Sequence, residues 1–110
     1  MSTQIYDVPV GAKSPKVDAR LVLCLLDYRR HLLMDYQKMG GDPLWDVQFK
    51  AGSKYIRVFT ISHGSRSCHS FVDYKGVIWK SASWKAPAKN FPRGDVNDPT
   101  SWGNIHWNGL

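Results

Sequence analysis

Apolar residues recur at helical spacing in the first third of the chain. They follow one another three or four positions apart, the period of an amphipathic helix, at Val17, Leu21, Leu25, Tyr28, Leu32 and Tyr36. Ser14 and Pro15 are typical of a helix start, and Gly40-Gly41 is typical of a helix end. The pattern predicts one long helix over residues 15–39, within a helical region 14–40 that follows a flexible segment at residues 1–13.

The spacing of apolar residues changes from helical to alternating after Gly41. Trp45, Val47 and Phe49 alternate with polar residues, which predicts a strand. Further strands are expected over residues 55–62, 67–73 and 77–83, separated by a loop at 63–66 and by short turns. Short connections favour antiparallel pairing of consecutive strands. The pattern therefore predicts a single α+β domain over residues 1–110, with the long N-terminal helix packed on an antiparallel sheet of about four strands between residues 44 and 83.

The last part of the chain, residues 84–110, has no regular pattern. Several proline and glycine residues interrupt it, so we expect an irregular tail with at most a turn of helix near residues 98–102. Large apolar side chains in such a tail indicate packing onto its own domain or onto a second subunit, and this tail contains Phe91, Trp102, Ile105 and Trp107. Because one helix and one small sheet have little room for so many rings, we expect a homodimer with residues 91–110 in its interface.

Alternation along the predicted strands sorts their side chains onto two faces. One face is aliphatic and small, and we expect the helix to cover it; it contains Ile56, Val58, Thr60, Cys68, Ser70, Val72, Ile78 and Ala82. The other face combines rings with basic groups: Tyr55, Arg57, Phe59, His69, Phe71, Val77 and Trp79. Such a face suits base stacking and phosphate binding, although the same rings also fit a core that the tail covers. Lys80 falls on the aliphatic face, which indicates a β-bulge or a change of register.

Positive charge is concentrated in the second half of the chain. The whole sequence has a net charge of +6. The segment from Lys50 to Arg93 has nine basic residues against one acidic residue, Asp73, which gives this segment a net charge of +8. Such an asymmetry predicts a partner that presents phosphates. The alternative is a basic surface that serves solubility alone.

Three parts of the basic segment supply the candidate ligand contacts. The loop with His63, Ser65 and Arg66 places donors beside a glycine, as a phosphate cradle does. The ring-bearing face contributes Arg57, His69 and Trp79. The proline-stiffened run after the last strand adds a ring and spaced cations that can follow a phosphate backbone: Trp84, Lys85, Lys89 and Arg93. The alternative in each case is an ordinary polar loop or a solvated surface.

Little in the sequence points to catalysis, a metal or a cofactor, and we expect none of them. All nine acidic residues are aspartates, and a single aspartate in the basic segment is too few for a two-metal nuclease. No group of histidines and cysteines has zinc spacing. Cys24 and Cys68 are interpreted as buried thiols in a reducing compartment, with a disulfide between them left open. The longest apolar run, at residues 21–26, is too short to cross a bilayer, so we expect no membrane partner.

Two nearby strings of residues resemble a known family. His69-Ser70-Phe71-Val72 and the run Lys80-Ser81-Ala82-Ser83-Trp84-Lys85-Ala86-Pro87-Ala88-Lys89 resemble a pair of motifs in a family of small proteins of tailed bacteriophages. The resemblance covers residues 53–96 and implies a viral protein in the host cell cytoplasm, with no established activity. We therefore expect a non-enzymatic phage protein that binds single-stranded nucleic acid. The alternative is an anti-defence protein that sequesters a small phosphorylated nucleotide messenger or inhibits a host protein.

Overall fold

A computed structural model of the protein describes residues 18–110, in which one long helix, α1, spans Ala19–Gln37. The predicted start at Ser14-Pro15 lies outside the described residues. The helix is capped by Asp18, whose side chain accepts a hydrogen bond from the Leu21 N–H at 2.8 Å. It ends shortly before Gly40, whose φ of 71° lies in the left-handed region that favours glycine. The buried side of α1 is part of the predicted stripe: Leu21, Leu25, Tyr28 and Leu32.

The helix packs on a six-stranded antiparallel sheet, which confirms the predicted α+β class. β1 (Asp46–Ala51), β2 (Tyr55–Ser62), β3 (Ser65–Asp73) and β4 (Val77–Ser81) pair in chain order. The tail is less irregular than predicted, because β5 (Pro87–Ala88) and β6 (Gly94–Asp95) both pair with β4. The predicted turn of helix near residues 98–102 is present as η1 (Pro99–Trp102).

The connection between β2 and β3 is shorter than predicted. Only His63 and Gly64 lie outside the strands, and their φ angles of 52° and 81° are those of a tight hairpin turn with two left-handed residues. Ser65 and Arg66 are therefore strand residues and not loop residues. The strand β4 ends at Ser81, before the predicted end at residue 83. It ends there because the N–H groups of Ala82 and Ser83 both donate hydrogen bonds to the carbonyl oxygen of Ala86.

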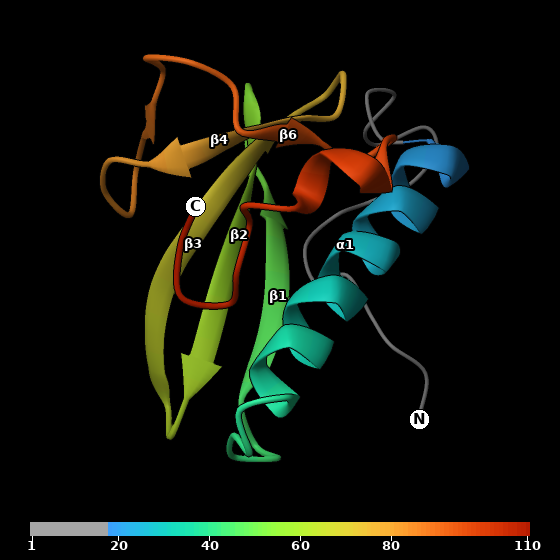
Figure 1. The fold of residues 1–110 in the computed structure, drawn as a ribbon. Helices are drawn as coiled ribbons and strands as arrows, with labels where there is room; N and C mark the ends of the chain where they lie inside the picture. The colour runs from blue at the N-terminus through green and yellow to red at the C-terminus, as the bar shows by residue number, and fades with distance from the viewer. Residues whose placement is uncertain (1–17) are drawn as a thin grey trace.

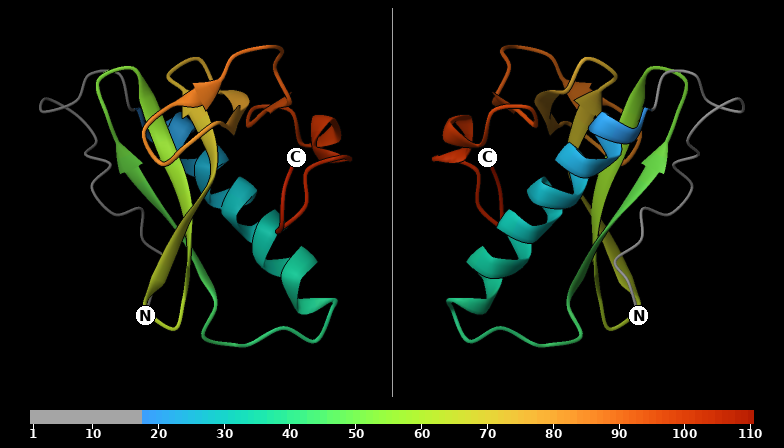
Figure 2. Two further views of the ribbon diagram at one scale, coloured as in Figure 1. Left: turned by 90° about the vertical axis from the view of Figure 1, so that its left-hand side faces the viewer. Right: turned by 90° about the vertical axis from the view of Figure 1, so that its right-hand side faces the viewer.

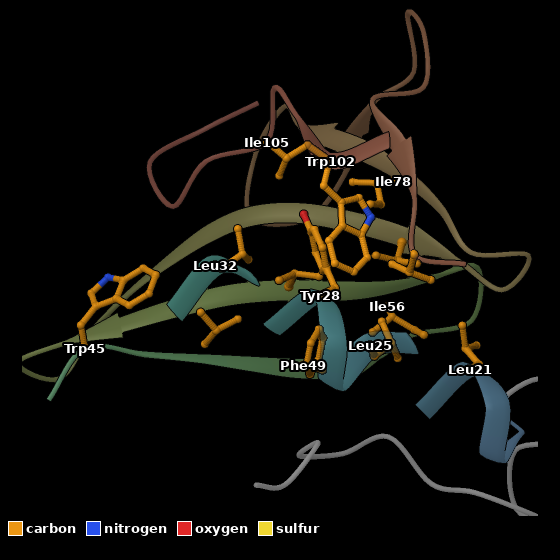
Figure 3. Packing of buried hydrophobic residues seen from close by; sticks show 14 residues of the cluster. Leu21, Leu25, Tyr28, Leu32, Trp45, Phe49, Ile56, Ile78, Trp102 and Ile105 are labelled. Atoms are coloured by element: carbon orange, nitrogen blue, oxygen red, sulfur yellow. The ribbon is translucent and has the colours of Figure 1, made fainter. Parts of the chain in front are cut away.

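Figures 1 and 2 show that α1 and the C-terminal segment after β6 lie on the same side of the sheet. The hydrophobic core lies between the sheet and these two segments (Figure 3). In this core the ring centroid of Trp102 is 5.6 Å from that of Tyr28. Trp45 and Trp102 are buried within the single chain, and Trp107 is partly buried. The crowding of rings from which we predicted a dimer is thus relieved inside one chain, and the homodimer stays a prediction.

A β-bulge in β3 alters the predicted assignment of side chains to the two faces. Val58 pairs with Ser70, but Phe59 pairs with Cys68, so His69 is the additional residue. Ser70 contacts Tyr28 of α1, and His69 lies on that same side. The bulge thus moves His69 to the face that α1 covers, the helix face, and Cys68 to the opposite, outer face. The outer face contains Tyr55, Arg57, Phe59, Cys68, Phe71 and Trp79.

Candidate nucleic-acid interface

The rings of the outer face lie side by side across β2, β3 and β4. Tyr55 meets Phe71 edge to face, with ring centroids 6.1 Å apart. The guanidinium carbon of Arg57 lies 5.9 Å from the centroid of the Phe71 ring. Phe59 and Phe71 are only 4% and 3% exposed, so part of this face is core. The covered-core interpretation therefore applies to part of the face, and the binding interpretation stays a prediction for the rest.

The segment of residues 82–89 provides this cover, and not the C-terminal segment, which packs on the helix face. Arg57 Nε donates a hydrogen bond of 2.7 Å to the carbonyl oxygen of Trp84. The Arg57 guanidinium carbon also lies 4.6 Å from the Trp84 ring centroid, and that ring meets Phe59 at 5.5 Å. Trp84 nevertheless stays 37% exposed. Trp84 is therefore a surface ring that the guanidinium of Arg57 holds against the sheet.

Two further cations lie over rings of the outer face. Lys89 Nζ is 5.0 Å from the ring centroid of Trp79 and 5.6 Å from that of Tyr55. The guanidinium carbon of Arg66 is 5.4 Å from the Phe59 ring centroid. Exposed contacts of this kind are each worth about 0.5–1 kcal/mol. They are weak enough for a ligand to replace them.

A groove opens between the β1–β2 turn and the 82–89 segment, and we call it the basic groove. It has a volume of about 440 Å³. Its lining includes four basic side chains and two rings, with no carboxylate among the described residues that form it: Lys50, Lys54, Arg57, Lys85, Tyr55 and Phe71. Asp73 is the acidic residue on the neighbouring turn, and its carboxylate accepts hydrogen bonds from the Lys75 and Val77 N–H groups and from Trp79 Nε1. The groove therefore keeps its positive charge.

The structure brings half of the predicted ligand contacts together on the outer face: Arg57, Trp79, Trp84, Lys85 and Lys89. Arg66 lies on the same face beside Phe59. His63 does not join them, since its Nε2 lies 2.8 Å from Asp42 Oδ2 at the hairpin turn. Ser65 pairs with Ser62 at the strand end, so the predicted phosphate cradle at residues 63–67 is not formed.

Arg93 and His69 hold the chain together instead of facing the basic groove. Arg93 donates a 2.8 Å hydrogen bond to the main-chain oxygen of Leu110, and its guanidinium lies 4.1 Å from the Phe91 ring centroid. His69 Nε2 lies 2.7 Å from the carbonyl oxygen of His106, and its Nδ1 hydrogen-bonds with Ser70 Oγ at 2.9 Å. Burial lowers the pKa of His69, so the ring is neutral at pH 7.

Two groove residues, Lys50 and Lys54, were not among the predicted contacts. They flank the β1–β2 turn, and the turn directs both toward the groove. The available signal was their position on either side of Gly52-Ser53, next to Tyr55. Their contribution to the charge of the basic segment did not by itself indicate that they lie beside the rings.

Burial raises the pKa of the Cys68 thiol to about 11, which keeps it protonated at neutral pH. Both cysteines are free. Residues 18–110 contain no cluster of His, Cys or Asp that could hold a metal ion. They also include no helix long and apolar enough to cross a bilayer.

The fold and the groove define a small α+β protein with a basic, ring-bearing sheet face. The chain belongs to a family of unknown function, DUF7717, whose model matches residues 12–109. A search of curated proteins and a search of solved structures each found no match. The family match includes the helix and the tail, which lie outside the phage resemblance over residues 53–96. Both the matched family and the family of the resemblance lack an established activity.

Proposed function

We propose that this protein binds single-stranded nucleic acid in the basic groove, without catalysis. The observation that supports the proposal most is the lining of the groove, where four cations accompany the partly exposed ring of Tyr55 and no described carboxylate opposes them. Cations neutralise phosphates and rings stack bases, which together are the usual means of binding single strands. Together with the phage resemblance, the proposal describes a protein of a tailed bacteriophage that acts in the host cell cytoplasm.

The energies of the existing contacts allow a nucleic acid to enter. Trp79 and Trp84 already contact Lys89 and Arg57. Each such contact is worth about 0.5–1 kcal/mol, whereas a base stacked on an aromatic ring is worth about 1–3 kcal/mol. At Trp79 the exchange therefore favours the base, and the displaced Lys89 remains close enough to meet a phosphate. The gain is smaller at Trp84, because Arg57 is also held by its hydrogen bond to the Trp84 carbonyl oxygen.

The number of cations in the groove favours a single strand over a small nucleotide. Four basic side chains line the groove between the β1–β2 turn and the 82–89 segment. A single strand presents one phosphate per nucleotide and can engage several cations at once, whereas a small messenger has few phosphates. The nucleotide-sequestering alternative thus has less support at this site.

Fluorescence anisotropy with a labelled oligothymidylate tests the proposal. We expect binding at low salt that weakens steeply as salt is added, because bound cations displace counterions from the strand. Trp79→Ala and Trp84→Ala should each weaken binding. Trp84 contacts the groove residue Arg57, and Trp79 shares the Lys89 cation with the groove residue Tyr55. Phe91→Ala is the matched control, since the exposed ring of Phe91 contacts Arg93, which does not line the groove. Absence of binding at low salt would refute the proposal, and equal effects of all three variants would refute the role of stacking.

A further inference from the structure

A second cavity lies on the helix face of the sheet, and we call it the tail cavity. It is bounded by β2, β3 and β4 on one side and by residues 107–110 on the other, and its volume is about 460 Å³. Sites for small molecules commonly have volumes of this order. Because the sheet separates it from the basic groove, the two are independent sites.

The sheet side of the tail cavity is polar and has unused hydrogen-bonding groups. Lys80 pairs with Ser70 across the strands, which places it on the helix face, and it is exposed. No described carboxylate lies within ion-pair distance of its ammonium group. The hydroxyl groups of Ser62 and Ser67 make no hydrogen bond to any described residue. An ammonium and two hydroxyls without a partner among residues 18–110, all on the same wall, suit a phosphate or a carboxylate.

The opposite end of the tail cavity is a wall of rings. Tyr36 and Trp45 stack with centroids 4.2 Å apart, and Trp107 meets Tyr36 edge to face at 4.8 Å. The Trp107 N–H donates a 2.9 Å hydrogen bond to Asp35 Oδ2, which fixes the ring-bearing segment against α1. The wall is therefore formed before any ligand arrives, which lowers the entropic cost of binding.

The charges around the tail cavity favour an anion. Its lining includes Lys80 and no aspartate among the described residues, and the Leu110 main-chain oxygen accepts a hydrogen bond from Arg93. The nearest aspartates already have partners, since Asp35 lies 3.5 Å from His106 Nδ1 and accepts from Trp107, and Asp42 lies beside His63. His69 at the floor is neutral at pH 7, because burial lowers its pKa by more than the hydrogen bond to the His106 carbonyl oxygen raises it.

We infer that the tail cavity binds a small organic anion with a flat ring, of the size of a nucleoside monophosphate. The ring lies against Trp45 and Trp107, and the phosphate meets Lys80, Ser62 and Ser67. This inference does not depend on nucleic-acid binding in the basic groove, because no residue lines both sites.

Isothermal titration calorimetry of the full chain with adenosine, guanosine, cytidine and uridine monophosphates tests this inference. We expect saturable binding of at least one of them at one site. Lys80→Ala should weaken it about tenfold or more, because the hydrogen bond to a charged partner is lost. Lys54→Ala is the matched control and should leave the affinity unchanged, since Lys54 lines only the basic groove.

The same variants separate this inference from the proposed function. Lys80→Ala should leave oligothymidylate binding unchanged while it weakens monophosphate binding. Inorganic phosphate and adenosine, tested alone, should each bind more weakly than the monophosphate, because each meets only one wall. Absence of saturable monophosphate binding, or binding that Lys80→Ala leaves unchanged, would overturn the inference. Monophosphate binding lost in Lys54→Ala would also overturn it, since that result places the ligand in the basic groove.

Discussion

The two faces of the sheet contain tryptophans in different environments. On the helix face, Trp102 contacts the rings of Tyr28 and His31, and its Nε1 donates a 2.9 Å hydrogen bond to the carbonyl oxygen of Asp95. On the outer face, Trp79 and Trp84 contact the cations of Lys89 and Arg57. A ring packed among rings and main-chain oxygens stabilises the fold. A ring packed under a cation at the surface is where we expect a ligand to replace the cation.

The largest effect that follows from this difference is on stability. Trp102→Ala should lower the free energy of unfolding by about 3–5 kcal/mol, because it leaves a cavity in the core. Trp84→Ala should lower it by about 1 kcal/mol or less, since mainly surface contacts are lost. Urea denaturation followed by circular dichroism measures both. Equal losses in the two variants would show that Trp84 is as much a core residue as Trp102.

A smaller effect is expected from the cations of the β1–β2 turn. Replacement of both Lys50 and Lys54 by alanine should reduce the slope of log affinity against log salt for oligothymidylate by about 1.4, since each lost phosphate contact removes about 0.7 for a single strand. The free energy of unfolding should stay within about 0.5 kcal/mol of the parent.

The matched control for this variant is the replacement of Arg20 and Arg30 by alanine. Both residues are exposed on α1, and neither lines the basic groove. The control should leave the slope unchanged. If the two double variants reduce the slope equally, the binding reflects total charge and not the groove.

The smallest effect concerns pH and the helix face. Burial lowers the pKa of His69 below its ordinary value of 6.5, so the folded chain binds fewer protons than the unfolded chain in the range between the two values. The contribution of His69 to the free energy of unfolding is therefore complete above pH 6.5 and is lost as the pH falls through the lowered pKa. The pKa of Asp35 is lowered from 3.8, chiefly by the hydrogen bond from the Trp107 main chain. Asp35 therefore changes the stability only at more acidic pH.

Thermal melts between pH 7.5 and 5 measure this dependence. The parent should lose stability on acidification, and His69→Asn should show a flatter profile together with a lower stability at pH 7.5. His63→Asn is the control, since His63 is exposed at the hairpin turn. A profile that only His63→Asn flattens would assign the pH dependence to the ion pair with Asp42.

The regular elements of the fold were predictable because their periods are plain in the sequence. The stripe from Leu21 to Leu32 is the buried side of α1, and the bounds predicted for β2 are those observed. The bulge at His69 was not placed, because the β3 residues before it, Ser65, Arg66 and Ser67, are all polar and have no apolar alternation in which a shift would show. β5 and β6 have two residues each, too few to show a period, and they are defined by pairing with β4.

The candidate site was only half predictable for related reasons. Arg57, Trp79 and Trp84 follow from alternation and from the ring beside the lysines. His69 was assigned to the outer face because the bulge was not placed. Lys50 and Lys54 reach the groove through the direction of a turn, which composition does not reveal. Arg93 was counted as a ligand contact, yet its hydrogen bond is to Leu110, distant in sequence.

The five tryptophans allow the most direct test of the central claim, that nucleic acid binds the outer face. Trp79 and Trp84 lie on that face, whereas Trp45, Trp102 and Trp107 lie on the helix face. A titration of the ¹⁵N-labelled protein with oligothymidylate, followed by NMR, reports each indole N–H separately. We expect saturable shifts of the Trp79 and Trp84 indole signals and unchanged signals for the other three. Shifts confined to the signals of Trp45, Trp102 and Trp107 would contradict it.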